Sequence, residues 1–190
     1  MTQRVAPDAR ADDNLVNSAR DGDVAAFEQL VRLHYAQVYG VARGILGRDT
    51  DAEDATQDTF VRAWRALPSF RGESAFTTWL YRIATNVSLT MVKRRRDAAT
   101  NKIPDRGTRA TAPDARLEDR ERLAVVQQIM DGLPGDARAA FVLRDIQGLT
   151  YEHIAETLDI SLSAVKSRIF RARRALADGL SAYDQVGGGT

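Results

Sequence analysis

Residues 149–176 read LTYEHIAETLDISLSAVKSRIFRARRAL and predict a helix-turn-helix. The first helix would begin at Thr150, whose hydroxyl can cap the first turn, and would end near Leu158. Residues 159–161 form a turn short enough to reverse the chain directly into a second helix, which Ser161 would cap. Apolar residues of the second helix recur every three or four positions and form one packing face: Val165, Ile169, Ala172 and Leu176.

The opposite face of this second helix is basic and can donate hydrogen bonds. Five basic residues lie between Lys166 and Arg174, and no acidic residue interrupts them. Such a face suits the phosphates and base edges of a DNA major groove. A solvated surface helix is the alternative, but the short turn and the small Ala155 favour DNA binding. The residues on this face are Ser163, Lys166, Ser167, Phe170, Arg171 and Arg174.

The composition limits the class of protein. The 190 residues carry a net charge of +1 and include no cysteine and two histidines. This composition excludes disulfide frameworks, thiol catalysis and cysteine zinc sites, and it disfavours a histidine-based metal or catalytic site. No apolar run reaches the length of a membrane span or a secretion signal, so we expect a soluble cytoplasmic protein. Positive charge concentrates in residues 93–116, which carry 8 basic and 3 acidic side chains.

Hydrophobic periodicity predicts an all-α fold made of two small helical domains. The first domain, residues 12–96, would contain helices over 12–19, 23–46, 50–67 and 74–96. The second domain, residues 117–182, would add helices over 117–132 and 136–146 to the helix-turn-helix. A flexible basic linker, residues 97–116, would join them, with a disordered leader over 1–11 and a disordered tail over 183–190. The expected caps are Asp23, a capping box of Thr50 with Glu53, Ser74 and, at a helix end, Gly47.

The helix expected over 50–67 has an acidic outer face. Asp51, Asp54 and Asp58 recur at three- and four-residue spacing, which places their carboxylates side by side. A solvated face is the common explanation for such a row, and a divalent metal site would need a second acidic motif that the sequence lacks. The third hypothesis is a docking face for another protein, with Phe60 and Trp64 as apolar anchors.

The segment after Pro68 joins an aromatic, glycine-bearing loop to a helix with a polar face. Phe70, Arg71 and Phe76 flank Gly72, and Arg82 and Asn86 follow on the helix. Aromatic rings and hydrogen-bonding side chains in this arrangement can receive unstacked bases. From periodicity alone, the alternative in which the aromatic side chains are simply core residues is favoured.

Three stretches together resemble the extracytoplasmic-function sigma factors, the promoter-specificity subunits of bacterial RNA polymerase. DAEDATQDTFVRAWRAL (51–67) resembles their core-polymerase docking helix, and FRGESAFTTWLYRIATNVSLTMVKRRR (70–96) resembles the segment that reads and melts the −10 element. The helix-turn-helix resembles their reader of the −35 element. The order of the three and the length of the linker make this resemblance more specific than a helix-turn-helix alone.

The resemblance implies roles for residues at the matching positions. It assigns core-polymerase binding to Asp51, Asp54, Gln57, Asp58, Phe60, Arg62 and Trp64. It assigns −10 DNA binding, with a flipped base in the loop, to Phe70, Arg71, Gly72, Ser74, Phe76, Arg82 and Asn86. It assigns −35 DNA binding to Ser163, Lys166, Ser167, Arg168, Phe170, Arg171, Arg173 and Arg174, with Ser163, Arg168, Arg173 and Arg174 as phosphate contacts.

The resemblance also implies the partners of the chain. They are core RNA polymerase, through its β′ clamp helices and β subunit, promoter DNA, and an anti-sigma factor, which can be membrane-bound. No catalytic residue, metal ion, cofactor or small-molecule substrate is expected, because the polymerase would perform the chemical step. The alternatives are a conventional helix-turn-helix regulator, which would bind duplex DNA alone as a symmetric dimer, and, more weakly, a metal-dependent helical enzyme.

Overall fold

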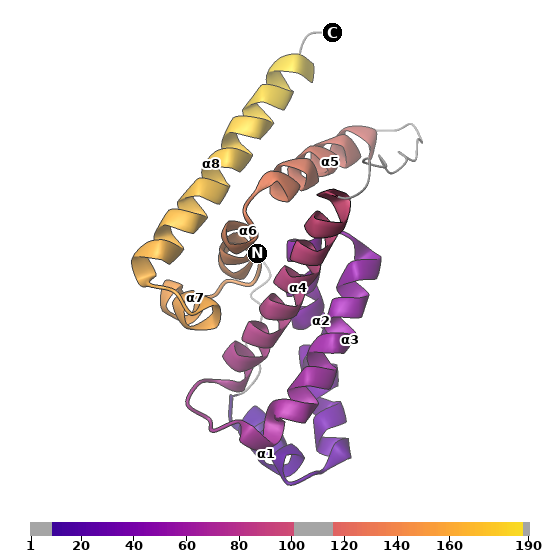
Figure 1. Cartoon of the computed structure of the whole chain (residues 1–190), viewed down its shortest axis with the longest axis vertical. Coiled ribbons are helices and arrows are strands. Elements are labelled where there is room, and N and C mark those ends of the chain that lie inside the picture. The colour runs from indigo at the N-terminus through magenta and orange to yellow at the C-terminus, as the bar shows by residue number, and fades with distance from the viewer. Residues whose placement is uncertain (1–8, 101–115, 188–190) are drawn as a thin grey trace.

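A computed structural model describes residues 9–100 and 116–187, and within these ranges the chain is all helical (Figure 1). Four α-helices and a short 3₁₀ turn form the first domain: α1 (Ala9–Arg20), α2 (Val24–Leu46), α3 (Asp49–Ala66), η1 (Leu67–Ser69) and α4 (Phe76–Thr100). The second domain follows: α5 (Arg116–Gly132), α6 (Gly135–Phe141), a π-helical turn η2 (Val142–Ile146), α7 (Tyr151–Leu158) and α8 (Leu162–Gly187). The expected all-α, two-domain architecture is confirmed. No described helix is both long and apolar enough to span a bilayer.

Several helices extend beyond the predicted limits. Helix α4 continues past Arg96 to Thr100, and Ala98 and Ala99 in this extension have the highest helix propensity. Helix α1 starts at Ala9, inside the expected leader, and α8 reaches Gly187, inside the expected tail. The rest of the leader, linker and tail, residues 1–8, 101–115 and 188–190, lies outside the described residues.

The helix ends follow local hydrogen-bonding chemistry. The Asp23 carboxylate accepts from the backbone of the first turn of α2, and Gly47 ends that helix at φ 78°, a left-handed conformation that glycine adopts freely. The predicted capping box at Thr50 is wrong: α3 starts earlier, its N-cap is Arg48, and no side chain caps it. Asp49 instead accepts from Tyr39 (2.9 Å) and from Arg43. Helix α4 begins at Phe76, and the hydroxyl of Ser74 donates to the carbonyl oxygen of Ala75 (3.5 Å).

The helix-turn-helix has the predicted caps and packing. The Thr150 hydroxyl accepts from the backbone of His153 (3.2 Å), and Ser161 accepts from that of Ala164 (3.3 Å). Asp159 makes the turn at φ 52°, which aspartate tolerates better than most residues. The predicted packing face is buried, and α8 contacts both α6 and α7: Val165, Ile169 and Ala172 are at most 2% exposed, and Leu176 is half-buried.

The two domains pack against each other. Helix α2 contacts α6 and η2, and α4 contacts α6 and α7. Buried residues of both domains, including Ile45 of α2 and Val142 of η2, belong to one continuous hydrophobic cluster. In Figure 1 the magenta α4 therefore lies beside the orange α7, which brings the helix-turn-helix close to the first domain.

Candidate nucleic-acid interface

An open pocket of about 250 Å³ lies between the loop after α3 and the beginning of α4. The loop turns at Gly72, whose φ of 71° is favourable for glycine. Four of the seven −10 residues predicted from the sequence line the pocket, together with four residues that the prediction did not include. The lining residues are Ser69, Phe70, Arg71, Glu73, Ser74, Trp79, Arg82 and Glu156.

Two aromatic rings, Phe70 and Trp79, form the apolar side of this pocket, and a third ring, Phe76, packs against both. Phe70 lies 4.9 Å from Trp79 between ring centroids and meets Phe76 edge-on at 6.1 Å. Phe76 is 5% exposed and does not line the pocket; it supports Phe70 and Trp79 from behind. The half-buried Trp79 offers a surface on which an unpaired base can stack.

The polar side of the pocket continues along one face of α4. Trp79, Arg82 and Asn86 are spaced by three and four residues, so they share a helical face, and Arg82 and Asn86 are exposed. Asn86 is not a lining residue but lies on the next turn. Its amide can both donate to and accept from a base edge. The Arg82 guanidinium donates to the backbone oxygen of Glu156 in α7 (3.0 Å), which closes one wall of the pocket.

The recognition helix α8 exposes most of the predicted −35 residues. The aromatic ring of Phe170 is 65% exposed on this face and is free to contact a thymine methyl group. The exposed members of the predicted set are Ser163, Lys166, Ser167, Phe170, Arg171, Arg173 and Arg174. This surface has the length and charge to enter a major groove.

Two of the predicted phosphate contacts are engaged within the protein. Nε of Arg168 donates to Asp136 at 2.6 Å, and its side chain is 20% exposed. Partial burial raises the pKa of Asp136, but the bond and charge of Arg168 outweigh burial and lower that pKa below its usual value. Arg173 donates twice to Asp145, at 2.6 and 3.2 Å, and this hydrogen bond raises the pKa of Arg173. Arg168 thus points into the domain, away from the DNA-facing surface.

The predicted docking face on α3 divides into exposed and packed residues. Asp54, Gln57 and Arg62 are exposed, and Asp58 pairs with Arg62 at 2.9 Å, a bond that raises the pKa of Arg62. Asp51 is partly covered and pairs with Arg95 of α4 at 3.4 Å. The two predicted anchors lie inward: Phe60 is 7% exposed, and Trp64 packs on Phe27 with 4.9 Å between ring centroids.

The pocket contains four residues that the predicted −10 set did not include: Ser69 and Glu73 of the loop, Trp79 and Glu156. Trp79 could have been found from its place three residues before Arg82, on the face that also carries Asn86. Glu156 carries no such signal, because it reaches the pocket only through the packing of the two domains. Within the described ranges, no group of three or more histidine or acidic side chains is arranged to hold a metal ion.

Comparison with known proteins places both domains in one family. Residues 30–98 match Sigma-70 region 2, and residues 123–176 match Sigma-70, region 4. The chain is 38% identical over 173 residues to an ECF RNA polymerase sigma-E factor of Haemophilus influenzae, covering 85% of this chain and 91% of that protein. It is 41% identical over 169 residues to the ECF RNA polymerase sigma factor SigE of Mycolicibacterium smegmatis, covering 85% of this chain and 65% of that protein.

Solved structures show the same likeness. The structure of CnrH in complex with the cytosolic domain of CnrY superimposes with a TM-score of 0.68 at 37% identity, covering 90% of this chain and 98% of CnrH. The two family regions coincide with the pocket-bearing domain and the helix-turn-helix domain. The chain belongs to the extracytoplasmic-function (ECF) sigma factors of the sigma-70 family.

Proposed function

We propose that this chain binds core RNA polymerase and directs it to a specific set of promoters. In this proposal the exposed acidic face of α3 docks on the β′ clamp helices, the aromatic pocket receives a flipped base of the −10 element, and α8 reads the −35 element. The observation that carries the proposal is the presence, in one chain, of a base-sized aromatic pocket and an exposed basic recognition helix in two separate domains. We assign the chain no chemical step; phosphodiester synthesis belongs to the polymerase.

The chemistry of each surface supports its role. Flipping a base costs a few kcal/mol, and stacking on Trp79 with edge contacts to Asn86 can offset this cost. An arginine or lysine on α8 can bind guanine or a phosphate in the major groove. The carboxylate of Asp54 is exposed on α3 and available to basic groups of a partner protein.

We further propose an anti-sigma factor as a regulatory partner. CnrH, which is 37% identical to this chain, was solved with the cytosolic domain of a second protein, CnrY, bound to it. An inhibitor of this kind would act on the cytoplasmic side, and the chain itself would work in the cytoplasm.

Reconstitution tests the proposed function. The purified chain is combined with core polymerase that lacks any sigma factor, and complex formation and transcription are measured on fragmented genomic DNA of its source. We expect a stable complex that initiates at a shared two-part motif. If no complex forms and the chain alone binds duplex DNA tightly as a dimer, the chain is a conventional regulator and the proposal is wrong.

A further inference from the structure

Behind the aromatic pocket, helix α1 forms a buried polar pair with α2. Asp12 of α1 is 6% exposed and His34 of α2 is 1% exposed, and Nε2 of His34 lies 3.2 Å from the Asp12 carboxylate. Nδ1 of the same ring lies 3.1 Å from the side-chain oxygen of Gln37. Both nitrogens of the imidazole therefore face oxygen atoms, and the ring cannot turn over without losing these contacts.

Stability alone does not explain a polar pair at this place. Nε2 of His34 and Oδ1 of Asp12 have no aligned hydrogen-bond partner among the described residues, so their contact is close but is not a well-formed hydrogen bond. Apolar side chains of similar volume often stabilise a protein as well as a buried polar or charged pair does, or better. What such a pair can supply instead is one fixed orientation of its members.

The His34 ring packs on an aromatic residue that supports the pocket. Its centroid lies 5.5 Å from that of Phe76, the first residue of α4, and the two rings are tilted by 59°. Phe76 in turn lies 5.6 Å from Trp79 and 6.1 Å from Phe70, the two rings that line the pocket. A continuous series of side-chain contacts therefore runs from Asp12 to the surface on which a base would stack.

Helix α1 also contacts the elements on both sides of the pocket loop. Besides packing on α2, it contacts η1, the turn that precedes the loop, and α4, the helix that follows it. Val16 and Ala19 of α1 are buried in the same hydrophobic cluster as Phe70 and Phe76. The helix that carries Asp12 is thus anchored against the elements that hold the pocket rings.

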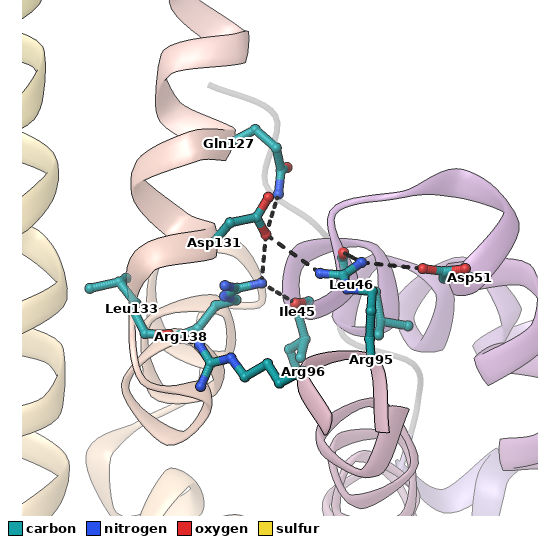
Figure 2. A network of polar contacts seen from close by, with 9 residues as sticks. All are labelled: Ile45, Leu46, Asp51, Arg95, Arg96, Gln127, Asp131, Leu133 and Arg138. Carbon is teal, nitrogen blue, oxygen red and sulfur yellow. Dashed lines mark hydrogen bonds and ion pairs between the residues drawn. The ribbon is translucent and has the colours of Figure 1, made fainter. Parts of the chain in front are cut away.

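The buried pair lies apart from the contact between the two domains. In that contact, Arg138 of α6 donates to the carbonyl of Ile45, in the last turn of α2, at 2.8 Å (Figure 2). His34 precedes Ile45 by about three helical turns. A substitution of Asp12 or His34 should therefore act on the pocket without disturbing the domain contact.

We propose that His34, held by Asp12, is a positioning residue for the base pocket. It fixes Phe76, and through Phe76 it keeps Phe70 and Trp79 in the arrangement that accepts a base. The consequence for promoter reading rests on the proposed function, but the positioning itself is a property of the free chain and is measurable without polymerase or DNA. The alternative is a structural role, in which the pair only stabilises the first domain.

Quenching of tryptophan fluorescence reports on the pocket in the free chain. The chain has two tryptophans, so Trp64→Phe leaves Trp79 as the single reporter. In this background Asp12→Ala should raise the quenching of Trp79 by acrylamide, because His34 and then Phe76 lose their fixed positions.

The matched control is Val41→Ala, at a fully buried position about two turns after His34 on the same helix. It removes bulk from the core and should cost the domain stability, but it should leave the quenching of Trp79 unchanged. Equal quenching in Asp12→Ala and the control, with unchanged circular dichroism, would overturn the inference.

Two further variants test the route of the effect. Asp12→Asn keeps the size of the side chain and an oxygen that can face Nε2 of His34, so it should return the quenching of Trp79 to that of the unmodified residue. In a chain that carries His34→Ala, adding Asp12→Ala should have no further effect, because Asp12 would act only through His34. A further increase, or a failure of Asp12→Asn to restore the quenching, would show that Asp12 does not act through His34.

Promoter binding measures the consequence for base reading. The complex of the chain with core polymerase is bound to promoter DNA whose −10 segment is already unpaired, and each base of that segment is replaced in turn. An aromatic contact changes an equilibrium constant by roughly two- to tenfold. Asp12→Ala should therefore lower discrimination at one −10 position by roughly two- to tenfold and leave discrimination at the −35 element unchanged. Equal losses at both elements would indicate general destabilisation and would contradict a positioning role.

The outcomes separate this inference from the proposed function. If the unmodified complex shows no base preference in the −10 segment, the proposed function of the pocket is wrong, but the quenching measurement still decides whether Asp12 and His34 position its rings. If the unmodified complex discriminates between bases and the Asp12→Ala complex discriminates equally well, the pair does not affect base reading and the inference is overturned.

Discussion

Arg168→Ala tests the assignment of the recognition helix most sharply. The resemblance places Arg168 among the phosphate contacts, but the structure directs its guanidinium to Asp136 of α6, at 2.6 Å and with 20% of the side chain exposed. Arg171, one turn along the same helix, is exposed. We therefore expect Arg168→Ala to reduce the stability of the second domain and Arg171→Ala to reduce DNA binding.

The expected magnitude follows from the geometry of the bond. A charge-assisted hydrogen bond contributes about 1.5–3 kcal/mol when its groups are buried. The Asp136 side chain is 47% exposed, so solvent screening reduces this contribution to about 1 kcal/mol. For a domain of about 60–100 residues, 1 kcal/mol corresponds to a fall in Tm of roughly 4–8 °C. If the whole chain unfolds as one unit, the expected fall in Tm is roughly half as large, because the entropy of unfolding grows with chain length.

Two assays separate the two roles. Thermal unfolding followed by circular dichroism should show the fall in Tm for Arg168→Ala and none for Arg171→Ala. Binding of the polymerase complex to a promoter, measured over a range of salt concentrations, reports phosphate contacts, because each one contributes about 0.9 to the slope of log affinity against log salt. The slope should stay constant for Arg168→Ala. A stable Arg168→Ala variant with a reduced slope would show that Arg168 leaves Asp136 to bind DNA, and the reasoning would be refuted.

Three further predictions concern other surfaces. Asp54→Lys should weaken binding to core polymerase while leaving Tm unchanged, because its carboxylate is exposed and has no structural role in α3; unchanged affinity would remove Asp54 from the docking face. Asn86→Ala should relax discrimination at one −10 base by roughly 1–3 kcal/mol without weakening binding at other positions, and retained base preference in a competition assay would count against its contact. Asp136 has a lowered pKa in the folded chain, so its stabilisation is present above an unfolded pKa of about 3.9 and is lost as the pH falls further. Acid unfolding should therefore be less steep in Arg168→Ala below about pH 4, and identical acid transitions would contradict the pairing.

Local patterns made the fold predictable where a helix carries a capping residue at its own end. Asp23, Gly47, Thr150 and Ser161 act on neighbours a few residues away, so sequence alone locates those helix ends. The predicted capping box at Thr50 was wrong because contacts with another helix decide where α3 begins. An acidic residue one position earlier, Asp49, lies in the first turn and is bound by two side chains of α2, which a local motif does not take into account.

The candidate site was predictable only where its residues share one element. Asn86 and Arg82 could be placed together from helical spacing, and so could the exposed face of α8. The inward turn of Arg168 could not be foreseen, because its partner Asp136 lies on another helix. The burial of Phe60 also depends on another helix. The resemblance assigns Phe60 to polymerase docking, but α2 packs on α3 and Phe60 is buried.

The domain contact was hidden from sequence reasoning for a more general physical reason. Its acceptors are backbone oxygens at helix ends, and every residue type supplies an identical carbonyl there. A side chain at Ile45 or Leu133 therefore gives no sign that an arginine will bind its oxygen. The sequence does specify the donor, Arg138, and its counter-charge, Asp131. It also specifies that position 44 is a glycine, which has no side chain. Because Arg138 is buried and a Cβ on Gly44 would meet Val142 at 2.8 Å, substitutions at these positions should act first on the packing of the two domains.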